Sequence, residues 1–159
     1  MDINTGKIII SGGKPLEGEI PVSGMKNAAV AIVFSTILTE DKCIIENLPD
    51  ISDVNVSLQI LESIGVKVNK LDKNTVEIDS SFVAPGIAPF DLVSKMRASY
   101  YLIGAELGRF GRAFVGLPGG CDFGARPIDQ HIKGFEALGC DVKAERREGA
   151  WYYYQHFTR

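Results

Sequence analysis

The sequence has little histidine and cysteine. Its 159 residues include two histidines and three cysteines, Cys43, Cys121 and Cys140, and no two cysteines have the spacing of a CxxC pair. Structural zinc sites need clusters of cysteine and histidine, and disulfide frameworks usually have an even number of cysteines. The composition therefore predicts reduced thiols and supports neither a zinc site nor a disulfide-stabilised fold.

The sequence also lacks an excess of basic residues and any long apolar run. Its formal charge at pH 7 is −3, whereas general nucleic-acid binders neutralise phosphates with many Lys and Arg residues. The apolar run near the N-terminus, residues 8–10, is too short for a signal peptide, and no segment approaches the roughly 20 residues of a membrane span. We therefore expect a cytoplasmic protein that binds neither nucleic acid nor membrane, and in which any anion binding is local.

What the sequence does contain is an internal repeat of about seventy residues. The segments that begin at Met25 and Met96 share one order of signals: an apolar helix, a turn, a short strand that ends in Leu-Pro, a second helix, and two strands joined by a polar turn. Gly65 and Gly139 close the second helix of each copy. The pattern predicts an α/β fold built from two similar units.

The two copies differ most after their Leu-Pro dipeptides. Leu48 is 17 residues before Gly65, whereas Leu117 is 22 residues before Gly139, so the second copy has five extra residues in or beside the segment GGCDFGAR. Loop insertions on a repeated scaffold often carry function. Cys121 lies in this insertion, where a nearby arginine and helix start would lower its pKa and favour a reactive thiol. A cysteine with no function in a turn remains the alternative, and we expect Cys43 and Cys140 to be structural.

Basic residues occur at three predicted helix starts, where the helix dipole favours an anion. Lys26 follows a predicted N-cap at Ser23, Lys95 and Arg97 follow one at Asp91, and Arg126 precedes Pro127 in the first turn of a third helix. The surrounding region also has a local basic excess, formed by Lys95, Arg97, Arg109, Arg112, Arg126 and Lys133 against Glu106, Asp122 and Asp129. These residues indicate either a shared anion site or a set of cations that point into solvent. His131 could reach such a site or lie on the surface.

Three segments, GEIPVSGMKNAA, SKMRAS and LPGGCDFGARPIDQHI, resemble the bacterial UDP-N-acetylglucosamine enolpyruvyl transferases, also called UDP-N-acetylglucosamine 1-carboxyvinyltransferases. The resemblance extends in register from about residue 7 to about residue 145. It implies transfer of the enolpyruvyl group of phosphoenolpyruvate to the 3-hydroxyl of UDP-N-acetylglucosamine with release of phosphate, the first committed step of peptidoglycan synthesis, without a metal or organic cofactor. The implied fold is a lobe of an inside-out α/β barrel made of βαβαββ units, of which about two are present.

The resemblance also implies roles for individual residues. Cys121 would protonate the methylene carbon of phosphoenolpyruvate, could form a covalent adduct with it, and would be the thiol that the antibiotic fosfomycin alkylates. Phosphoenolpyruvate would contact Lys26, Asn27 and Arg126. UDP-N-acetylglucosamine would contact Asn27, Arg97, Arg126, Pro127, Ile128, Asp129 and Gln130.

The family's enzymes are more than twice as long as this chain. By resemblance, residues 1–21 would belong to the other lobe and residues 22–159 would form an incomplete N-terminal lobe, with the missing C-terminal lobe as structural partner. Gln130 stands where the family often has an aliphatic residue, and the tail QHFTR does not resemble the family's continuation. We therefore expect the chain alone to be inactive. The alternatives are an enolpyruvylshikimate-phosphate synthase-like enzyme and a non-catalytic truncated fragment.

Overall fold

The computed structural model describes residues 11–117, 119, 127–147 and 150–157. The first unit begins after an extended segment, residues 11–25, that contains no helix or strand. Its elements in chain order are α1 (Lys26–Ser35), the 3-10 helix η1 (Thr36–Leu38), β1 (Lys42–Ile45), α2 (Ser52–Ser63), β2 (Lys67–Lys70) and β3 (Val76–Asp79).

The second unit repeats this order with one interruption in its first helix. Its elements are α3 (Phe90–Val93), the 3-10 helix η2 (Arg97–Tyr100), α4 (Tyr101–Phe110), β4 (Arg112–Gly116), α5 (Asp129–Ala137), β5 (Cys140–Arg147) and β6 (Ala150–Phe157). Within the described residues, no helix is both long enough and apolar enough to span a membrane.

The sheet topology confirms the internal repeat. The strand order is β1-β3-β2 in the first sheet and β4-β6-β5 in the second, and each central strand is antiparallel to both neighbours. The corresponding turns also match. The backbone N–H of Leu48 bonds the carbonyl oxygen of Asn74, just before the central strand β3, and that of Leu117 bonds the carbonyl oxygen of Trp151, within the central strand β6. Gly65 and Gly139 end the second helices with φ values of 96° and 88°, a conformation that favours glycine.

The observed unit is αβαββ, shorter than the βαβαββ unit that the resemblance implies. Residues 11–25 and 83–89, which precede the first helix of each copy, are extended but are not part of a strand. Both predicted hairpins are present, β2–β3 and β5–β6.

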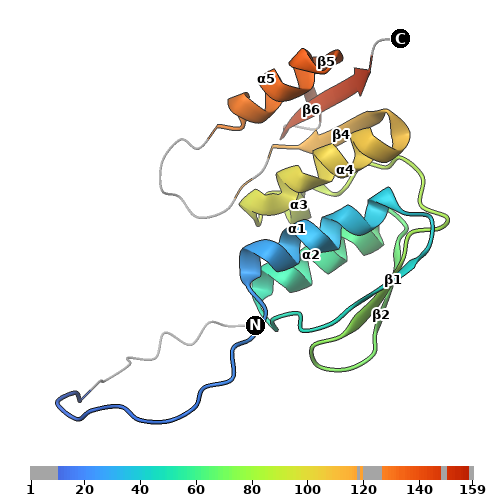
Figure 1. Ribbon diagram of the computed structural model, residues 1–159. Coiled ribbons are helices and arrows are strands. Elements are labelled where there is room, and N and C mark those ends of the chain that lie inside the picture. The colour runs from blue at the N-terminus through green and yellow to red at the C-terminus, as the bar shows by residue number, and fades with distance from the viewer. Residues whose placement is uncertain (1–10, 118, 120–126, 148–149, 158–159) are drawn as a thin grey trace.

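The helices lie side by side with their N-terminal ends at one end of the molecule. Figure 1 shows α1, α2, α4 and α5 all beginning at the left of the view. The core lies mainly between these helices and the helix-facing sides of the two sheets. Its largest fully buried apolar side chains come from both units and are Phe34, Ile37, Ile60, Leu61, Ile78, Leu102 and Ile103.

The helix boundaries differ from the sequence-based expectation at all three starts. Met25, not Ser23, is the N-cap of α1, and Ile128 is the N-cap of α5, so Pro127 lies outside that helix. Asp91 lies inside α3, whose N-cap is Pro89. This helix then breaks because Met96 is extended, and the Ser99 hydroxyl lies 2.9 Å from the carbonyl oxygens of both Val93 and Met96. Arg97 therefore opens a separate 3-10 helix.

The chain just before α1, and the chain at the break between α3 and η2, each pack tightly against the turn that carries the neighbouring Leu-Pro dipeptide. A Cβ added at Gly24 would overlap the carbonyl oxygen of Asn47, and one added at Gly119 would overlap the carbonyl oxygen of Ser94. Asn47 itself is the one non-glycine residue in the described chain with a left-handed φ, 55°. The two contacts join corresponding segments of the repeat but not corresponding residues, and the glycine lies before the helix in the first unit and in the turn in the second.

We expect Gly24→Ala to lower the free energy of unfolding by about 1–3 kcal/mol, because its methyl group meets backbone that cannot move aside. The matched control is Gly134→Ala in α5, where the added Cβ meets nothing within 4 Å. That variant should gain about 0.5–1 kcal/mol from the better helix propensity of alanine. Urea unfolding of both variants tests this, and equal effects at the two positions would contradict the steric explanation.

One ionisable side chain, Glu106 on α4, is buried in the packed interior. Only 1% of its surface is exposed. Its Oε2 accepts a hydrogen bond of 3.3 Å from the backbone N–H of Phe114, while Oε1 has no partner among the described residues. Burial therefore raises the pKa of Glu106 to about 8, and this hydrogen bond opposes the rise only in part.

The raised pKa predicts a specific pH dependence of stability. The folded state holds the proton of Glu106 more tightly than the unfolded state does. The contribution of Glu106 to the free energy of unfolding is therefore fully present below pH 4.5 and is lost as the pH rises towards about 8. The loss should be on the order of a few kcal/mol. Glu106→Gln should abolish this component, whereas Glu136→Gln on the exposed side of α5 should retain it. Identical pH profiles of unfolding for wild type and Glu106→Gln would contradict the prediction.

Candidate functional site

The N-terminal ends of α1 and α2 are joined by an ion pair. Lys26 Nζ lies 2.6 Å from Asp53 Oδ2, with 55% and 31% of the two side chains exposed. Lys26 is the first residue of α1, and Asp53 is in the first turn of α2. The Asp53 carboxylate offsets the unfavourable interaction between the Lys26 cation and the dipole of α1. Asp53 is itself stabilised by the dipole at the N-terminal end of α2. Sequence reasoning missed Asp53, although an acidic residue in a first helical turn was a usable signal.

A short chain of contacts connects this ion pair to Arg97. The buried Ser57 hydroxyl lies 2.8 Å from the carbonyl oxygen of Asp53 and 3.5 Å from Sδ of Met96. Met96 is itself buried and directly precedes Arg97. The SKMRAS segment is therefore fixed by its buried methionine and serine, while its arginine is half-buried.

Arg97 and the start of α5 are brought together through an aromatic ring. The guanidinium of Arg97 lies 5.8 Å from the ring centroid of Tyr100, within cation–π range. The same ring also contacts His131, with the two ring centroids 4.7 Å apart. His131 is exposed, and its ring contact with Tyr100 places it on the surface beside η2.

The segment before and within the first turn of α5 has mixed exposure. Pro127, Asp129 and Gln130 are exposed, and the Gln130 amide nitrogen donates a 3.0 Å hydrogen bond to Asp129. Ile128 is buried in the core. Any contact that Ile128 makes with a ligand would therefore come from its backbone. Asn27 is exposed beside Lys26.

The two remaining predicted site residues, Cys121 and Arg126, lie outside the described residues. Gly119 and Pro127, which are described, flank this segment, and Gly119 packs against Ser94 just before Lys95 and Arg97. The two remaining cysteines agree with the structural interpretation in burial, since Cys140 is buried and Cys43 is half-buried.

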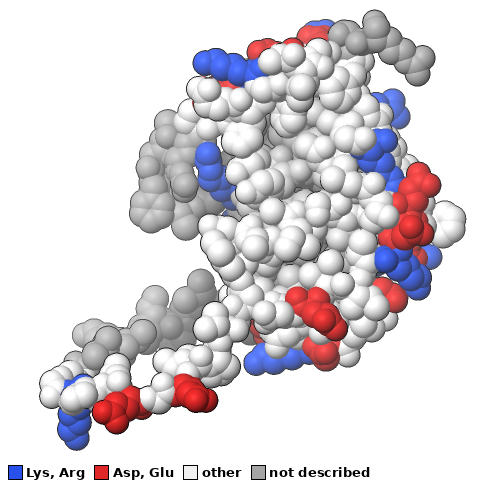
Figure 2. Space-filling model, viewed as in Figure 1, with Lys and Arg blue, Asp and Glu red and all other residues white. Residues whose placement is uncertain are grey.

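The local basic excess does not form one anion site. Arg109, near the C-terminal end of α4, donates bonds of 2.8 and 2.7 Å to the carbonyl oxygens of Ile37 and Thr39 at the end of η1. Arg112 opens β4 beyond the same end of α4. The interpretation of a shared site was therefore wrong for these two residues. On the face in Figure 2, basic and acidic side chains are interspersed along the edge, and the middle is uncharged.

Among the described residues, no group of three or more His, Cys, Asp or Glu side chains is placed to hold a metal ion. The site described so far consists of Lys26, Asn27 and Arg97 with the first residues of α5. These groups can provide positive charge and hydrogen bonds to an anionic ligand at the common end of the helices.

Comparison with known proteins identifies the family of the chain. A family model described as EPSP synthase (3-phosphoshikimate 1-carboxyvinyltransferase) matches residues 10–151. The chain belongs to this family. Within the EPSP synthase family, its relatives include UDP-N-acetylglucosamine 1-carboxyvinyltransferase 2 of Clostridium acetobutylicum, 55% identical over 86% of this chain. Another is UDP-N-acetylglucosamine 1-carboxyvinyltransferase 3 of Caldanaerobacter subterraneus, 46% identical over 93% of this chain. The chain spans only 33% and 37% of these relatives.

Solved structures agree on the EPSP synthase family fold. The enolpyruvyl transferase NikO from Streptomyces tendae matches 93% of this chain with a TM-score of 0.69 at 25% identity, over 32% of its own length. EPSP synthase from Acinetobacter baumannii matches 92% of this chain with a TM-score of 0.63 at 15% identity, over 33% of its own length. The sequence-based fold class, part of a lobe of an enolpyruvyl transferase-like α/β barrel, is confirmed.

The Lys26–Asp53 pair should contribute little to stability because both side chains are partly exposed. A double-mutant cycle with Lys26→Met and Asp53→Asn should give a coupling energy of about 0.2–1 kcal/mol in urea unfolding, and the coupling should shrink at high salt. A coupling well above this range, unchanged by salt, would show that the pair is more shielded from solvent than its exposure indicates.

Proposed function

We propose that this chain is the phosphoenolpyruvate- and nucleotide-binding part of a UDP-N-acetylglucosamine 1-carboxyvinyltransferase. The observation that carries this proposal is that about half of the aligned residues are identical to those of enzymes of that name. Substrate binding falls to the helix starts: Lys26 and Arg126 hold the phosphate and carboxylate of phosphoenolpyruvate, and Asn27 contacts both substrates. Arg97 and residues 126–130 contact UDP-N-acetylglucosamine. The shared position of the N-terminal ends of α1, α4 and α5 supports this division (Figure 1).

The proposed chemistry is addition followed by elimination. The Cys121 thiol gives its proton to the methylene carbon of phosphoenolpyruvate, and positive charge develops at the adjacent carbon. The 3-hydroxyl oxygen of the sugar attacks that carbon and loses its proton to a base. Loss of phosphate, together with a proton from the new methyl group, restores the double bond. Cations around the substrate stabilise its phosphate and carboxylate throughout. The same thiol can add covalently to phosphoenolpyruvate and react with the epoxide of fosfomycin.

A second lobe is part of the proposal. Leu16, Ile20 and Val22 in the extended segment 11–25 are almost fully exposed, which is unusual for a cluster of large apolar side chains. We assign residues 1–21 to packing against a C-terminal lobe and residues 22–159 to an incomplete N-terminal lobe. The C-terminal lobe would supply the base for the sugar hydroxyl and a further arginine for phosphoenolpyruvate. The location is cytoplasmic, as fits an enzyme that uses two soluble metabolites.

The proposal is tested with a chimera in which residues 1–145 replace the matching third of the Clostridium acetobutylicum relative. We expect the chimera to release phosphate from phosphoenolpyruvate in the presence of UDP-N-acetylglucosamine, and the 159-residue chain alone to release none. Phosphate release by the isolated chain would refute its dependence on a second lobe. An inactive chimera that is folded and has an active parent enzyme would refute the proposed function.

The role of Cys121 is tested in the same chimera. Cys121→Ala should lower turnover by about 100-fold or more, since a positioned general acid typically contributes that factor. Cys121→Asp should keep a proton donor and retain turnover, but it should not be alkylated by fosfomycin. Mass spectrometry should show a fosfomycin adduct on wild-type Cys121, formed faster when UDP-N-acetylglucosamine is present. Full turnover by the alanine variant would place the acid elsewhere.

The alternative activity is that of an EPSP synthase, because the family model carries that description. The solved EPSP synthases are only 15% identical to this chain, whereas the UDP-sugar enzymes are 46–55% identical. Turnover of the chimera with shikimate 3-phosphate in preference to UDP-N-acetylglucosamine would reverse this ranking.

A further inference from the structure

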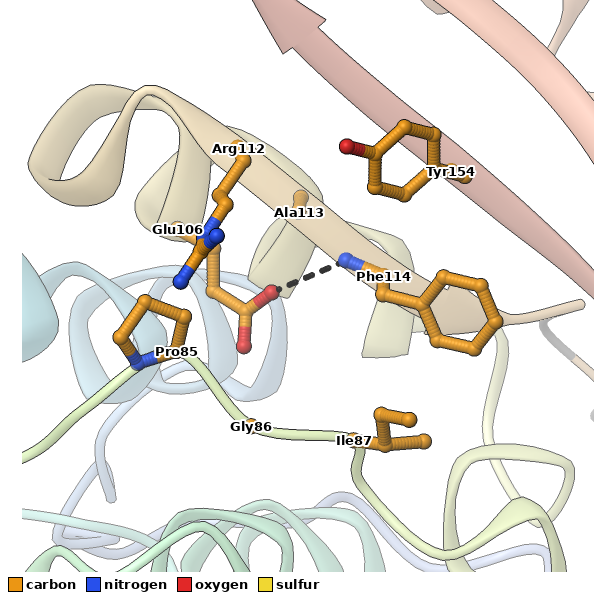
Figure 3. A pocket seen from close by; sticks show the side chains of 8 residues that line it. All are labelled: Pro85, Gly86, Ile87, Glu106, Arg112, Ala113, Phe114 and Tyr154. Carbon is orange, nitrogen blue, oxygen red and sulfur yellow. Dashed lines mark hydrogen bonds between the residues drawn. The ribbon is translucent and has the colours of Figure 1, made fainter.

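A cavity of about 220 Å³ lies away from the helix starts described above. Its walls come from the extended segment after β3, from the middle of α4, from β4 and from β6. The lining residues are Pro85, Gly86, Ile87, Glu106, Arg112, Ala113, Phe114 and Tyr154. Figure 3 shows Glu106 between the 85–87 segment and β4, with Arg112 and Tyr154 beyond it. None of these residues is among those assigned to the substrates.

The cavity contains a buried acid that is only half satisfied. Glu106 reaches from α4 to the backbone of β4, where its Oε2 accepts the N–H of Phe114 (Figure 3). Its Oε1 is buried and has no hydrogen-bond partner among the described residues. Buried polar atoms are nearly always paired, so an orphaned oxygen in the wall of a cavity indicates a missing ligand or water.

The rest of the wall is one cation, the hydroxyl group of Tyr154 and a set of apolar surfaces. Arg112 is exposed at the start of β4 and, among the residues that the structure describes, makes no ion pair. Pro85, Ile87 and the rings of Phe114 and Tyr154 supply apolar contact, and the two ring centroids lie 6.2 Å apart. The cavity is smaller than the roughly 300–1,000 Å³ of sites for drug-sized ligands, so it fits a ligand of about one ring.

We propose that this cavity binds a small organic monocarboxylate with a compact apolar body. Arg112 pairs with the carboxylate, the Glu106 carboxyl group donates a hydrogen bond to it through Oε1, and the apolar walls enclose the body of the ligand. Arg112 and Oε1 of Glu106 then each have a partner, and the ligand's charge balances that of Arg112.

The protonation of Glu106 favours a carboxylate over an amine. Since its pKa is raised to about 8, Glu106 is mostly neutral at pH 7 and offers a proton to an acceptor. An ammonium ligand would instead have to ionise Glu106 and sit close to the Arg112 guanidinium. Besides Glu106 and Arg112, the titratable residues on the elements that line the cavity are Tyr101 and Arg109 on α4 and Tyr152, Tyr153, Tyr154 and His156 on β6, and the segment 83–89 has none. His156 lies directly across the strands from Arg112.

Isothermal titration and NMR of the 159-residue chain with sodium benzoate test the proposal. At pH 7 we expect saturable binding of benzoate that shifts the amide signals of Phe114 and Tyr154, with much weaker binding of benzylamine. Arg112→Gln should weaken benzoate binding by about ten-fold or more, because it removes a charge-assisted contact. The matched control, Arg146→Gln on β5, should bind benzoate as the wild type does.

A pH series isolates the contribution of Glu106. Benzoate binding by the wild type should fall by about ten-fold between pH 7 and pH 9, as Glu106 ionises and repels the ligand. Glu106→Gln keeps an N–H donor of nearly the same shape and should bind equally at both pH values. His156→Asn should keep the wild-type pH dependence. Circular dichroism confirms that each variant is folded before titration.

Three results would overturn the proposal. The first is no saturable benzoate binding by the folded wild type, and the second is unchanged affinity in Arg112→Gln. The third is tighter binding of benzylamine than of benzoate, which would assign the cavity to cations. None of these results depends on whether the helix starts bind phosphoenolpyruvate, so this test is independent of the proposed function.

Discussion

The arrangement of the candidate site depends on a steric constraint, the backbone contact between the chain that enters α1 or η2 and the neighbouring Leu-Pro turn. Gly24 against Asn47 and Gly119 against Ser94 are the two instances. Lys26 lies two residues after the first contact, and Arg97 lies three residues after the second. Because glycine has no side chain, the two backbone segments can approach closely at each contact. This close approach fixes where the helices that begin at Lys26 and Arg97 start.

The repeat explains why the functional groups gather at one end. Each unit uses a helix to connect β1 to β2, or β4 to β5, around a central antiparallel strand, so corresponding helices start at the same edge of their sheets. Packing α1 beside α4 then places the N-terminal ends of α1, α4 and α5 at one end of the molecule (Figure 1), and Lys26 is the first residue of α1. Arg109, near the C-terminal end of α4, bonds the carbonyl oxygens at the end of η1, and Glu106, in the middle of α4, lines the cavity. The same helix thus separates the two kinds of site.

Several elements could be predicted from the sequence because local signals specify them. Glycines 65 and 139 closed the second helices as expected, and the alignment of Leu48 with Leu117 predicted two equivalent turns that the hydrogen bonds confirm. Family motifs identified the enolpyruvyl transferase-like fold. The helix starts were less predictable: Ser23 and Asp91 have good capping side chains, but the buried Met96 and the Ser99 hydroxyl determine where the second helix breaks. The residue roles at Cys121 and Arg126 stay predictions, since these residues lie outside the described chain.

The sequence by itself determined the repeat, the family and the candidate residues, because periodic apolar positions, turn residues and motif spacing are properties of neighbouring residues along the chain. Only the tertiary structure decided how the charges are used. Lys26 pairs with Asp53, 27 residues away in the sequence, and Arg109 bonds carbonyl oxygens about 70 residues away. Glu106 is shielded from solvent by packing against β4 and the segment after β3. Charge pairing and desolvation depend on distance in space, and the packing of two repeated units sets that distance.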